Sequence, residues 1–353
     1  MQEILIRPIA ETRIADVDFG NLEFGKYVSD HMFMCDYEKG DWQQPRIIPF
    51  GDIALSPTAL VFHYGQSLFE GMKAFRMQDD KICLFRPQKH YERLVKSMER
   101  MCMPLISEEL FLKGLEELLR IDESWIPGTE GAALYIRPMV FATEAKFGVK
   151  ISDEYRFIIF TGPTAAFFAR PLRLKVESKY VRAAPGGTGY AKCSGNYGGA
   201  FYPTQLAKSE GFDQVLWTDA CEHEYIEESG MMNAFFVLNN TLVTPPLSDS
   251  ILDGITRDSL LTLARDMKIP TDERPVSLTE LEEAFDNGTI QEAFGAGTAA
   301  VVSPIETINL RGRDRQLPEY GKGAIMFRLK QRLEAIRAGE EEDVHGWNHI
   351  IQL

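Results

Sequence analysis

The chain has 353 residues, of which 44% are hydrophobic and 25% charged, and 52 acidic against 38 basic residues give a formal net charge of -14. This composition is typical of a globular protein, and a chain of this length predicts two domains. The negative charge would repel a phosphate backbone, so we expect neither nucleic acid nor an anionic membrane surface as partner, and a small molecule is favoured.

No segment has the pattern of a targeting or membrane-spanning element. The N-terminus lacks the basic region and apolar core of a signal peptide, and no apolar run is long enough to cross a bilayer. The five cysteines include no Cys-x-x-Cys pair, so neither a disulfide framework nor a zinc site is predicted. We therefore expect a cytoplasmic protein with reduced thiols and no bound metal.

The first half of the chain has the pattern of a mixed α/β domain. From Pro87 onward, apolar side chains recur at i, i+3, i+4 and i+7, which predicts an amphipathic helix with proline in its first turn. Arg86 could pair with Glu92 on this helix or bind an anion. Ser107, followed by two glutamates, is a typical N-cap for a second helix that ends at 119. Strands are predicted at 33–37, 60–64, 71–76, 82–84, 133–142 and 156–161.

Tyr135 and Arg137 share one face of the predicted strand 133–142, because side chains alternate along a strand. An aromatic side chain beside a cation suits the lining of a pocket. An arginine in a surface ion pair, next to a half-buried tyrosine, fits the same pattern equally well.

A stretch rich in proline, glycine and alanine follows the strand at 156–161 and has the composition of a connection between domains. Its paired phenylalanines, which include Phe167, suit a segment that covers a site better than an exposed linker. We predict a smaller N-terminal α/β domain at 1–162, an interdomain loop at 163–171 and a larger C-terminal domain at 172–353.

The second half predicts another α/β domain. Asn239 and Asn240 are typical of a hairpin turn between two short strands. Ser277 and Glu280 have the spacing of a capping box at the start of a helix. Strands are predicted at 172–176, 214–218, 235–238 and 242–243, and helices at 199–208, 257–266, 278–285 and 323–338.

The segment 185–199 places one lysine, Lys192, and two tyrosines among six glycines. Glycines at this density let the backbone pass close to a ligand, so Lys192 is a candidate for a reactive amine. A flexible surface loop with a solvated lysine is the alternative. Neither the dinucleotide-binding fingerprint nor the P-loop spacing is present.

Two adjacent carboxylates and two glycine-containing segments could bind parts of a charged ligand. Glu227 and Glu228 are both candidates to pair with a cation or to lie in a solvated loop, and the residues alone do not choose. The segment 254–257 has the pattern of a loop that opens a helix, where amides and the helix dipole attract an anion, although Thr256 could equally be an ordinary N-cap. The segment 295–298 is a second glycine-rich stretch and ends in a hydroxyl.

Many motifs of the chain together resemble one family. The segment 185–199 resembles the cofactor-lysine segment of the branched-chain amino acid aminotransferases, which are fold-type IV pyridoxal-phosphate enzymes. Other motifs follow in that family's order and approximate spacing, and cover nearly the whole chain. They include Phe24-Gly25-Lys26, Leu68-Phe69-Glu70-Gly71, Leu84-Phe85-Arg86-Pro87, Tyr135-Ile136-Arg137-Pro138, Glu228-Ser229-Gly230-Met231, Gly254-Ile255-Thr256-Arg257 and Phe294-Gly295-Ala296-Gly297-Thr298-Ala299.

The resemblance implies a fold-type IV architecture of two α/β domains with the cofactor site at their interface, and pyridoxal 5'-phosphate as the cofactor. Lys192 would form the Schiff base and carry the proton during transamination. Glu228, chosen over Glu227 by the family register, would keep the pyridine nitrogen protonated, and Tyr197 would bond the phenolic oxygen. The phosphate would be bound by Arg86, Ile255, Thr256 and Thr298.

The resemblance also implies a substrate pocket with an aromatic wall, which favours branched aliphatic groups because burying each methylene contributes about 0.8 kcal/mol. Phe167 stands where many relatives carry tyrosine and Met231 where many carry threonine, so contacts from those hydroxyls are not expected. Backbone contacts to the substrate carboxylate from the turns at Met231 and Ala299 would survive both changes. The implied substrate-binding residues are Phe24, Tyr64, Phe69, Tyr135, Arg137, Phe167, Met231 and Ala299.

The activity implied is that of a branched-chain amino acid transaminase, which reversibly moves an amino group between leucine, isoleucine or valine and 2-oxoglutarate. The resemblance further implies at least a homodimer. A D-amino acid aminotransferase or an aminodeoxychorismate lyase would keep this fold and change the reaction. A non-catalytic protein that binds pyridoxal phosphate or a nucleotide would need neither Lys192 nor Glu228 as a matched set.

Overall fold

The computed structural model describes residues 3–129, 131–165 and 170–352. The chain divides into two compact units. Unit 1 contains Met1–Ala166, Ala191–Gly195 and Ile336–Leu353, and unit 2 contains Phe167–Tyr190 and Asn196–Ala335. Phe167, predicted to line the substrate pocket, lies outside the described residues.

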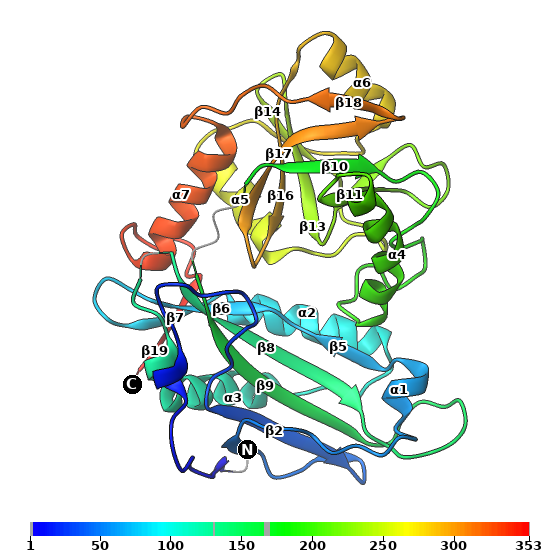
Figure 1. Cartoon of the computed structure of the whole chain (residues 1–353). Helices are drawn as coiled ribbons and strands as arrows, with labels where there is room; N and C mark the ends of the chain where they lie inside the picture. The colour runs from blue at the N-terminus through cyan, green and yellow to red at the C-terminus, as the bar shows by residue number, and fades with distance from the viewer. Residues whose placement is uncertain (1–2, 130, 166–169, 353) are drawn as a thin grey trace. The chain divides into compact units, whose positions relative to one another are not determined.

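Unit 1 is built on a ten-stranded sheet in the order β1-β4-β2-β9-β8-β6-β7-β19, to which β3 adds beside β2 and β5 beside β8 (Figure 1). Helices α2 and α3 bury their apolar sides in one core with the sheet, and α3 packs against β2. The strands are β1 (Leu5–Ile6), β2 (His31–Glu38), β3 (Asp41–Trp42), β4 (Arg46–Pro49), β5 (Ser67–Phe69), β6 (Met72–Arg76), β7 (Ile82–Phe85), β8 (Ala133–Ala142), β9 (Tyr155–Thr164) and β19 (Asn348–Ile351), and the helices are α1 (Leu60–Tyr64), α2 (Pro87–Arg100) and α3 (Glu108–Ile121), with short 3-10 turns at Ile14–Asp16 and Glu123–Trp125.

The predicted helices of unit 1 are confirmed. The amphipathic pattern from Pro87 forms α2, and the hydroxyl of Ser107 accepts a hydrogen bond from the amide of Leu110 at 3.1 Å at the start of α3. The prediction of a strand at 60–64 was wrong, because these residues form α1. A short apolar run does not distinguish a strand from a helical turn, and here Gly65, at φ 68°, ends the helix in the left-handed conformation.

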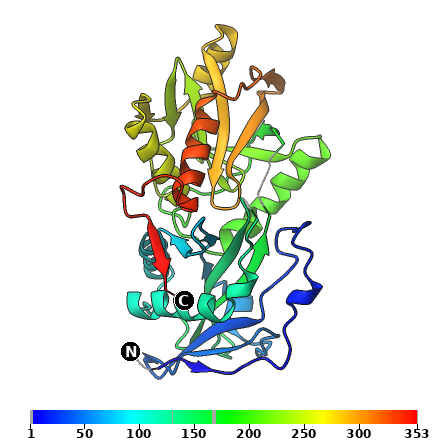
Figure 2. The same ribbon diagram turned by 90° about the vertical axis from the view of Figure 1, so that its left-hand side faces the viewer.

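The last strand belongs to the sheet of unit 1. In β19, His349 lies opposite Leu84 and Ile351 opposite Ile82 of β7, so the chain returns to unit 1 at its C-terminus (Figure 2). The predicted domain at 172–353 did not anticipate this pairing, because partners that are far apart in sequence leave no local signal.

Unit 2 is built on a nine-stranded sheet in the order β12-β11-β10-β17-β16-β13-β14-β15, with β18 beside β17 (Figure 1). The two faces of this sheet are covered by different helices. On one face, Leu216 packs in a core with helix α6, and on the other, its neighbours Val215 and Trp217 pack with Ala207 of helix α4. The strands are β10 (Leu172–Val176), β11 (Gln214–Thr218), β12 (Ile226–Ser229), β13 (Met232–Leu238), β14 (Thr241–Thr244), β15 (Thr271–Glu273), β16 (Ile290–Gly297), β17 (Val301–Leu310) and β18 (Arg313–Gln316), and the helices are α4 (Gly195–Ser209), α5 (Ile255–Asp266), α6 (Leu278–Asp286) and α7 (Ile325–Ala338).

Two local predictions in unit 2 are confirmed. Asn239 and Asn240 have φ values of 48° and 60° and join β13 to β14, as a hairpin turn with two left-handed residues requires. Ser277 caps α6 by accepting a hydrogen bond from the amide of Glu280 at 3.0 Å. The side chain of Glu280 does not complete the capping box and instead pairs with Arg274.

No helix in the described part of the chain is long and apolar enough to cross a membrane. Among residues 3–129, 131–165 and 170–352, no group of three or more His, Cys, Asp or Glu side chains could hold a metal ion. All five cysteines are free thiols, and Cys35, Cys83 and Cys193 are buried.

Candidate active site

The segment that carries Lys192 is held against strand β5 of unit 1. Phe69 donates its amide to the carbonyl of Lys192 at 3.1 Å, and Ser194 donates its amide to the carbonyl of Ser67 at 2.9 Å. Cys193, next to the lysine, therefore forms an isolated antiparallel β-bridge with Leu68 of β5. The lysine is fixed in place by its backbone, in contrast to the flexible surface loop that was the alternative.

A second contact to Lys192 comes from helix α2. The amide of Lys192 donates to the hydroxyl of Ser97 at 2.9 Å, and this hydroxyl donates to the carbonyl of Arg93 at 2.9 Å. Arg93 in turn binds both carboxylate oxygens of Glu70 at 2.8 Å, and His90 bonds to Glu70 at 2.8 Å. The lysine backbone is thus connected to a buried ionic network.

Glu70 is completely buried, yet it stays charged. Burial alone would raise the pKa of the Glu70 carboxyl, but the charge and hydrogen bonds of Arg93, with a further bond from His90, hold this pKa well below its ordinary value. Burial also lowers the pKa of His90. Glu70 and Arg93 therefore form a buried ion pair.

Glu70→Gln should destabilise the protein strongly. The substitution keeps the shape and leaves Arg93 buried without its counter-charge, and breaking a buried pair in this way costs about 3–5 kcal/mol. Urea unfolding measures the loss. Glu92→Gln is the matched control, because Glu92 lies on the same helix as Arg93 but pairs with Lys89 at the exposed surface, where such a pair contributes at most about 1 kcal/mol. Equal midpoints for the two variants would contradict the role of Glu70.

Four of the predicted pocket residues of unit 1 form a continuous chain of contacts with Lys192. The ring of Phe24 packs edge-on against Tyr135 at 4.9 Å between centroids, and the guanidinium of Arg137 donates to the hydroxyl of Tyr135 at 3.0 Å. The same guanidinium lies 4.5 Å from the centroid of the Phe69 ring, and the Nζ of Lys192 lies 5.0 Å from that centroid. An aromatic wall with a single cation is thus connected to the candidate amine.

A cavity of about 170 Å³ lies beside this chain of contacts. It is lined by Phe24, Gly25, Tyr27, Val28, Tyr135, Arg137, Phe160, Thr161, Gly162, Pro163 and Thr164. Tyr64, on α1, is 39% exposed.

Arg86 is 8% exposed and directly precedes α2 with a left-handed φ of 51°. Its guanidinium lies 5.0 Å from the centroid of the Trp347 ring. Glu92, the alternative partner of Arg86, pairs with Lys89 at 2.7 Å.

In unit 2, a β-bulge sets the positions of the two adjacent glutamates. Leu216 pairs with Ser229 and Thr218 with Ile226, so two residues of β12, Glu227 and Glu228, lie opposite the single residue between Leu216 and Thr218. Both glutamates are buried on a strand, so neither lies in a solvated loop. Bulges are common next to active sites because they redirect a side chain.

Glu228 is the glutamate that reaches the cavity of unit 2. Its carboxylate accepts the amide of Leu252 at 2.7 Å and pairs with the Nε of Arg182 at 3.2 Å. The cavity has a volume of about 170 Å³. It is lined by Arg182, Asn196, Tyr197, Ala200, Phe201, Thr204, Lys208, Gln214, Trp217, Glu228, Gly230, Met231 and Leu252.

Leu252 joins Glu228 to the start of helix α5. The amide of Leu252 donates a hydrogen bond to the carboxylate of Glu228. Its carbonyl accepts a hydrogen bond from the side-chain amide of Asn233 at 3.0 Å. Gly254, the N-cap of α5, lies so close to Asn233 that an added Cβ would be 1.9 Å from the Oδ1 of Asn233. A side chain at position 254 would therefore displace Asn233, and Ile255 and Thr256 are buried in the first turn behind the glycine.

The turn with Thr298 and Ala299 lies at the same end of the sheet. Glu228 is opposite Asn233 of β13, and Asn233 is opposite Ala296 of β16, two residues before Thr298. The candidate groups of unit 2 therefore converge on one end of the sheet, where the amides of a helix N-terminus can bind an anion.

Glu227 has a different environment from Glu228. One of its carboxylate oxygens has no hydrogen-bond partner among the described residues. Burial raises the pKa of Glu227 to about 7, against a hydrogen bond from Ser250 and the charge of Arg182, which lower it. This carboxyl is thus partly protonated at physiological pH.

Glu227→Gln should therefore stabilise the protein at alkaline pH. The folded pKa of about 7 lies above the ordinary value of 4.5, so the folded state binds more protons between these values and its stability falls as pH rises through that window. Glutamine carries no charge to bury, so the free energy of unfolding of the variant should exceed that of the parent by on the order of 2–3 kcal/mol at pH 8 and be equal to it at pH 4. Urea unfolding at the two pH values is the test, and a gain of equal size at both would contradict the assigned pKa.

Comparison with known proteins identifies the family of the chain. Residues 67–308, more than half of the chain, match the family described as amino-transferase class IV. The chain belongs to the class IV aminotransferase family. It is 42% identical over 344 residues, 96% of this chain and 94% of the relative, to branched-chain-amino-acid aminotransferase 2 of Bacillus subtilis. It is 44% identical over 336 residues, 94% and 93% of the two chains, to a probable branched-chain-amino-acid aminotransferase of Staphylococcus aureus.

Solved structures show the same fold for this class IV aminotransferase. The branched-chain amino acid aminotransferase of Escherichia coli superposes with a TM-score of 0.73 at 25% identity, over 92% of this chain and 99% of that one. The branched-chain aminotransferase of Thermoproteus uzoniensis with norvaline gives a TM-score of 0.72 at 26% identity, over 91% and 100%. The predicted α/β fold of a class IV enzyme is confirmed.

Several residues that shape the candidate site of this aminotransferase were not found from the sequence. Arg182 pairs with Glu228, and Ser97 holds the amide of Lys192. Both lie in ordinary stretches of sequence with no motif, and each acts through a partner many residues away. Glu70 stood in a quoted motif, but its burial with Arg93 is visible only in the structure.

Proposed function

We propose that this class IV aminotransferase is a branched-chain amino acid transaminase that uses pyridoxal 5'-phosphate to move an amino group between leucine, isoleucine or valine and 2-oxoglutarate. The observation that carries this proposal is the identity of 42% over nearly the full length to a curated relative of that name. The aromatic wall beside Lys192 in unit 1 supports it, because such a wall favours a branched aliphatic side chain over a polar one.

The described residues fit this cofactor. Glu228 is a carboxylate, 3% exposed, in a cavity with the phenol of Tyr197, and the first turn of α5 follows a glycine that leaves no room for a side chain. A carboxylate, a phenol and a helix N-terminus suit a pyridinium nitrogen, a phenolic oxygen and a phosphate. Pyridoxal phosphate, when bound, supplies an electrophilic carbon and an electron sink.

The chain's own groups have distinct roles in the proposed reaction. Lys192 would hold the cofactor and then move a proton to and from the α-carbon of the substrate. Glu228 would hold a proton on the ring nitrogen, and Arg182 would keep Glu228 ionised and oriented. Phosphate binding is assigned to Arg86, Ile255, Thr256 and Thr298, and substrate binding to Phe24, Tyr64, Phe69, Tyr135, Arg137, Phe167, Met231 and Ala299.

The visible absorption spectrum of the purified protein tests the proposal. We expect a yellow protein whose colour bleaches when leucine is added and returns with 2-oxoglutarate. A panel of amino acids then separates the related enzymes. A D-amino acid aminotransferase would bleach with D-alanine, and an aminodeoxychorismate lyase would bleach with neither leucine nor D-alanine. A colourless protein that cannot be loaded with the cofactor would contradict the proposal.

We further propose that the protein is a homodimer in the cytoplasm. Three apolar side chains near α1 support a partner: Phe62, Phe147 and Val149 are 61%, 85% and 84% exposed. Phe147 lies against His63 of α1, the residue after Phe62, and exposed apolar side chains that lie near one another are typical of protein interfaces. Free cysteines are compatible with a reducing compartment. Sedimentation equilibrium tests the dimer, and a monomer at micromolar concentration would contradict it.

A further inference from the structure

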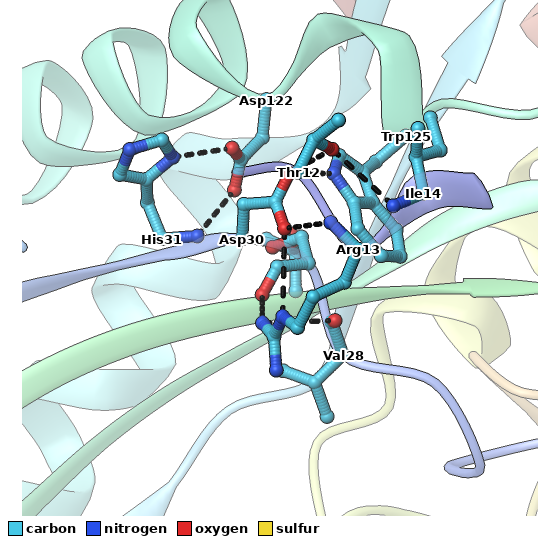
Figure 3. A network of polar contacts seen from close by, with 10 residues as sticks. Thr12, Arg13, Ile14, Val28, Asp30, His31, Asp122 and Trp125 are labelled. Carbon is cyan, nitrogen blue, oxygen red and sulfur yellow. Dashed lines mark hydrogen bonds and ion pairs between the residues drawn. The ribbon is translucent and has the colours of Figure 1, made fainter. Parts of the chain in front are cut away.

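The loop 14–29 of unit 1 is closed at its base by one carboxylate. Asp30, at the end of the loop, accepts a hydrogen bond from the hydroxyl of Thr12 at 2.5 Å and one from the amide of Arg13 at 3.0 Å (Figure 3). The two residues before the loop are therefore joined to the residue that follows it. Such a compact loop with neighbouring ends is an Ω-loop.

The side chain of Arg13 adds further bonds across the same base. Its guanidinium donates to the carbonyl of Ser29 at 2.5 Å and to that of Val28 at 3.4 Å, and its Nε lies 3.5 Å from Asp30 (Figure 3). Trp125 donates its indole N–H to Asp30 at 2.9 Å, which anchors the base to the main body of unit 1. The neighbouring His31 is likewise fixed, by two hydrogen bonds to Asp122 at 3.0 and 2.7 Å.

Asp30 is 5% exposed, and its carboxylate accepts all these hydrogen bonds as an anion. Burial would raise the pKa of this carboxyl, but the hydrogen bonds from Thr12, Arg13 and Trp125 lower it below its ordinary value. The anion is thus already satisfied by these donors.

The C-terminal part of the loop, next to its base, forms one wall of the unit 1 cavity. Phe24, Gly25, Tyr27 and Val28 line this cavity on one side, with Tyr135 among the residues of the opposite strands. The loop packs tightly on strand β9: a Cβ added at Gly162 would be 2.2 Å from the carbonyl oxygen of Tyr27, and the amide of Ser29 bonds Thr161 at 2.8 Å. The wall can therefore move only if the base of the loop moves.

We propose that Thr12, Arg13 and Asp30 form a clamp that positions the loop 14–29 and thereby sets the width of the cavity for the apolar side chain of the substrate. None of the three lines the cavity, so they are positioning residues that act through Phe24. Closing a loop of this length loses chain entropy, and the bonds of the clamp offset that loss. The part that concerns the substrate rests on the proposed function, whereas the part that concerns the loop does not.

Hydrogen exchange and steady-state kinetics of the full-length protein test the clamp. Asp30→Asn replaces one acceptor oxygen by a donor, and Thr12→Val removes one donor with little change of shape. Arg7→Ala is the control, because Arg7 is exposed and its only bond described here is made by its backbone. We expect faster exchange of the amides of 14–29 in both clamp variants, with exchange in β8 and β9 unchanged.

In steady-state kinetics, we expect the clamp variants to change KM and to leave kcat nearly unchanged. A looser wall weakens binding of leucine without moving the amine, so KM for leucine should rise about 10-fold, with kcat within about 2-fold of the parent. Unchanged exchange in the loop of Thr12→Val, or a fall of kcat at constant KM, would overturn the clamp. If no variant or parent transaminates leucine, the proposed function fails, and the exchange data still decide whether the clamp exists.

Discussion

Lys192→Ala is expected to abolish transamination and to remove the visible absorbance that depends on the lysine. Lys192 is the amine fixed by Ser97 and Phe69 beside an aromatic wall, and the proposed reaction needs it both to hold the cofactor and to move the proton. Loss of a proton-transfer group alone reduces turnover by about 10²–10⁴-fold. We therefore expect at least this loss in kcat for leucine.

A control variant at a second lysine, compared by its visible spectrum and its activity, shows whether the effect is specific to Lys192. Lys179→Ala is the matched control, because Lys179 is an exposed lysine near the same glycine-rich segment. It should retain colour and activity. Both variants should unfold at the temperature of the parent in the absence of cofactor, since Lys192→Ala keeps the backbone hydrogen bonds to Ser97 and Phe69. A Lys192→Ala protein that keeps the absorbance and the activity would show that another amine is used.

Elements with a clear local pattern could be predicted from the sequence. The strand at 133–142 was placed to the residue, and burial alternates along its central part, from Leu134 to Val140. The caps Ser107 and Ser277 were found because their bonds span only three residues. The run at 60–64 was misread because five residues are too few to show a period that separates a strand from one helical turn.

The candidate site was predictable only in part, for a different reason. Lys192 was marked by its glycines, and the contacts of Tyr135 and Arg137 were anticipated by strand alternation. The groups that fix these residues, such as Ser97 and Arg182, come from distant parts of the chain. Their roles depend on tertiary contacts, which no local pattern encodes.

The choice between Glu227 and Glu228 shows the same limit. The sequence alone gives two adjacent glutamates the same chemistry. Only the alignment of motifs with the family favoured Glu228 as the partner of the pyridine nitrogen. In the structure the bulge in β12 places both opposite one residue, yet only Glu228 lines the cavity. Their surroundings also differ in charge: Glu228 has Arg182 and an amide, whereas Glu227 has an oxygen without a partner.

Glu228→Gln should reduce turnover much more than Glu227→Gln. Glutamine keeps the shape of the side chain and removes the charge that would hold a proton on the ring nitrogen, so electron withdrawal from the substrate would weaken. Removing such a preorganised electrostatic group lowers kcat by about 10²–10³-fold in other enzymes, and we expect a loss of this order. Glu227→Gln should keep kcat within about 3-fold, because a carboxyl with a pKa of about 7 is already partly neutral in the parent.

The two variants control for each other, since they exchange the same group at adjacent positions of one strand. Single-turnover bleaching of the colour by leucine measures the first half of the reaction, which includes the step in which the proton leaves the α-carbon, and of the two glutamate variants only Glu228→Gln should slow it. Arg182→Gln should give a smaller loss of the same kind, because Arg182 pairs with Glu228 while Glu228 itself stays in place. The reverse ranking of the two glutamates would mean that the bulge presents Glu227 to the cofactor, and that the register drawn from the family is shifted by one residue.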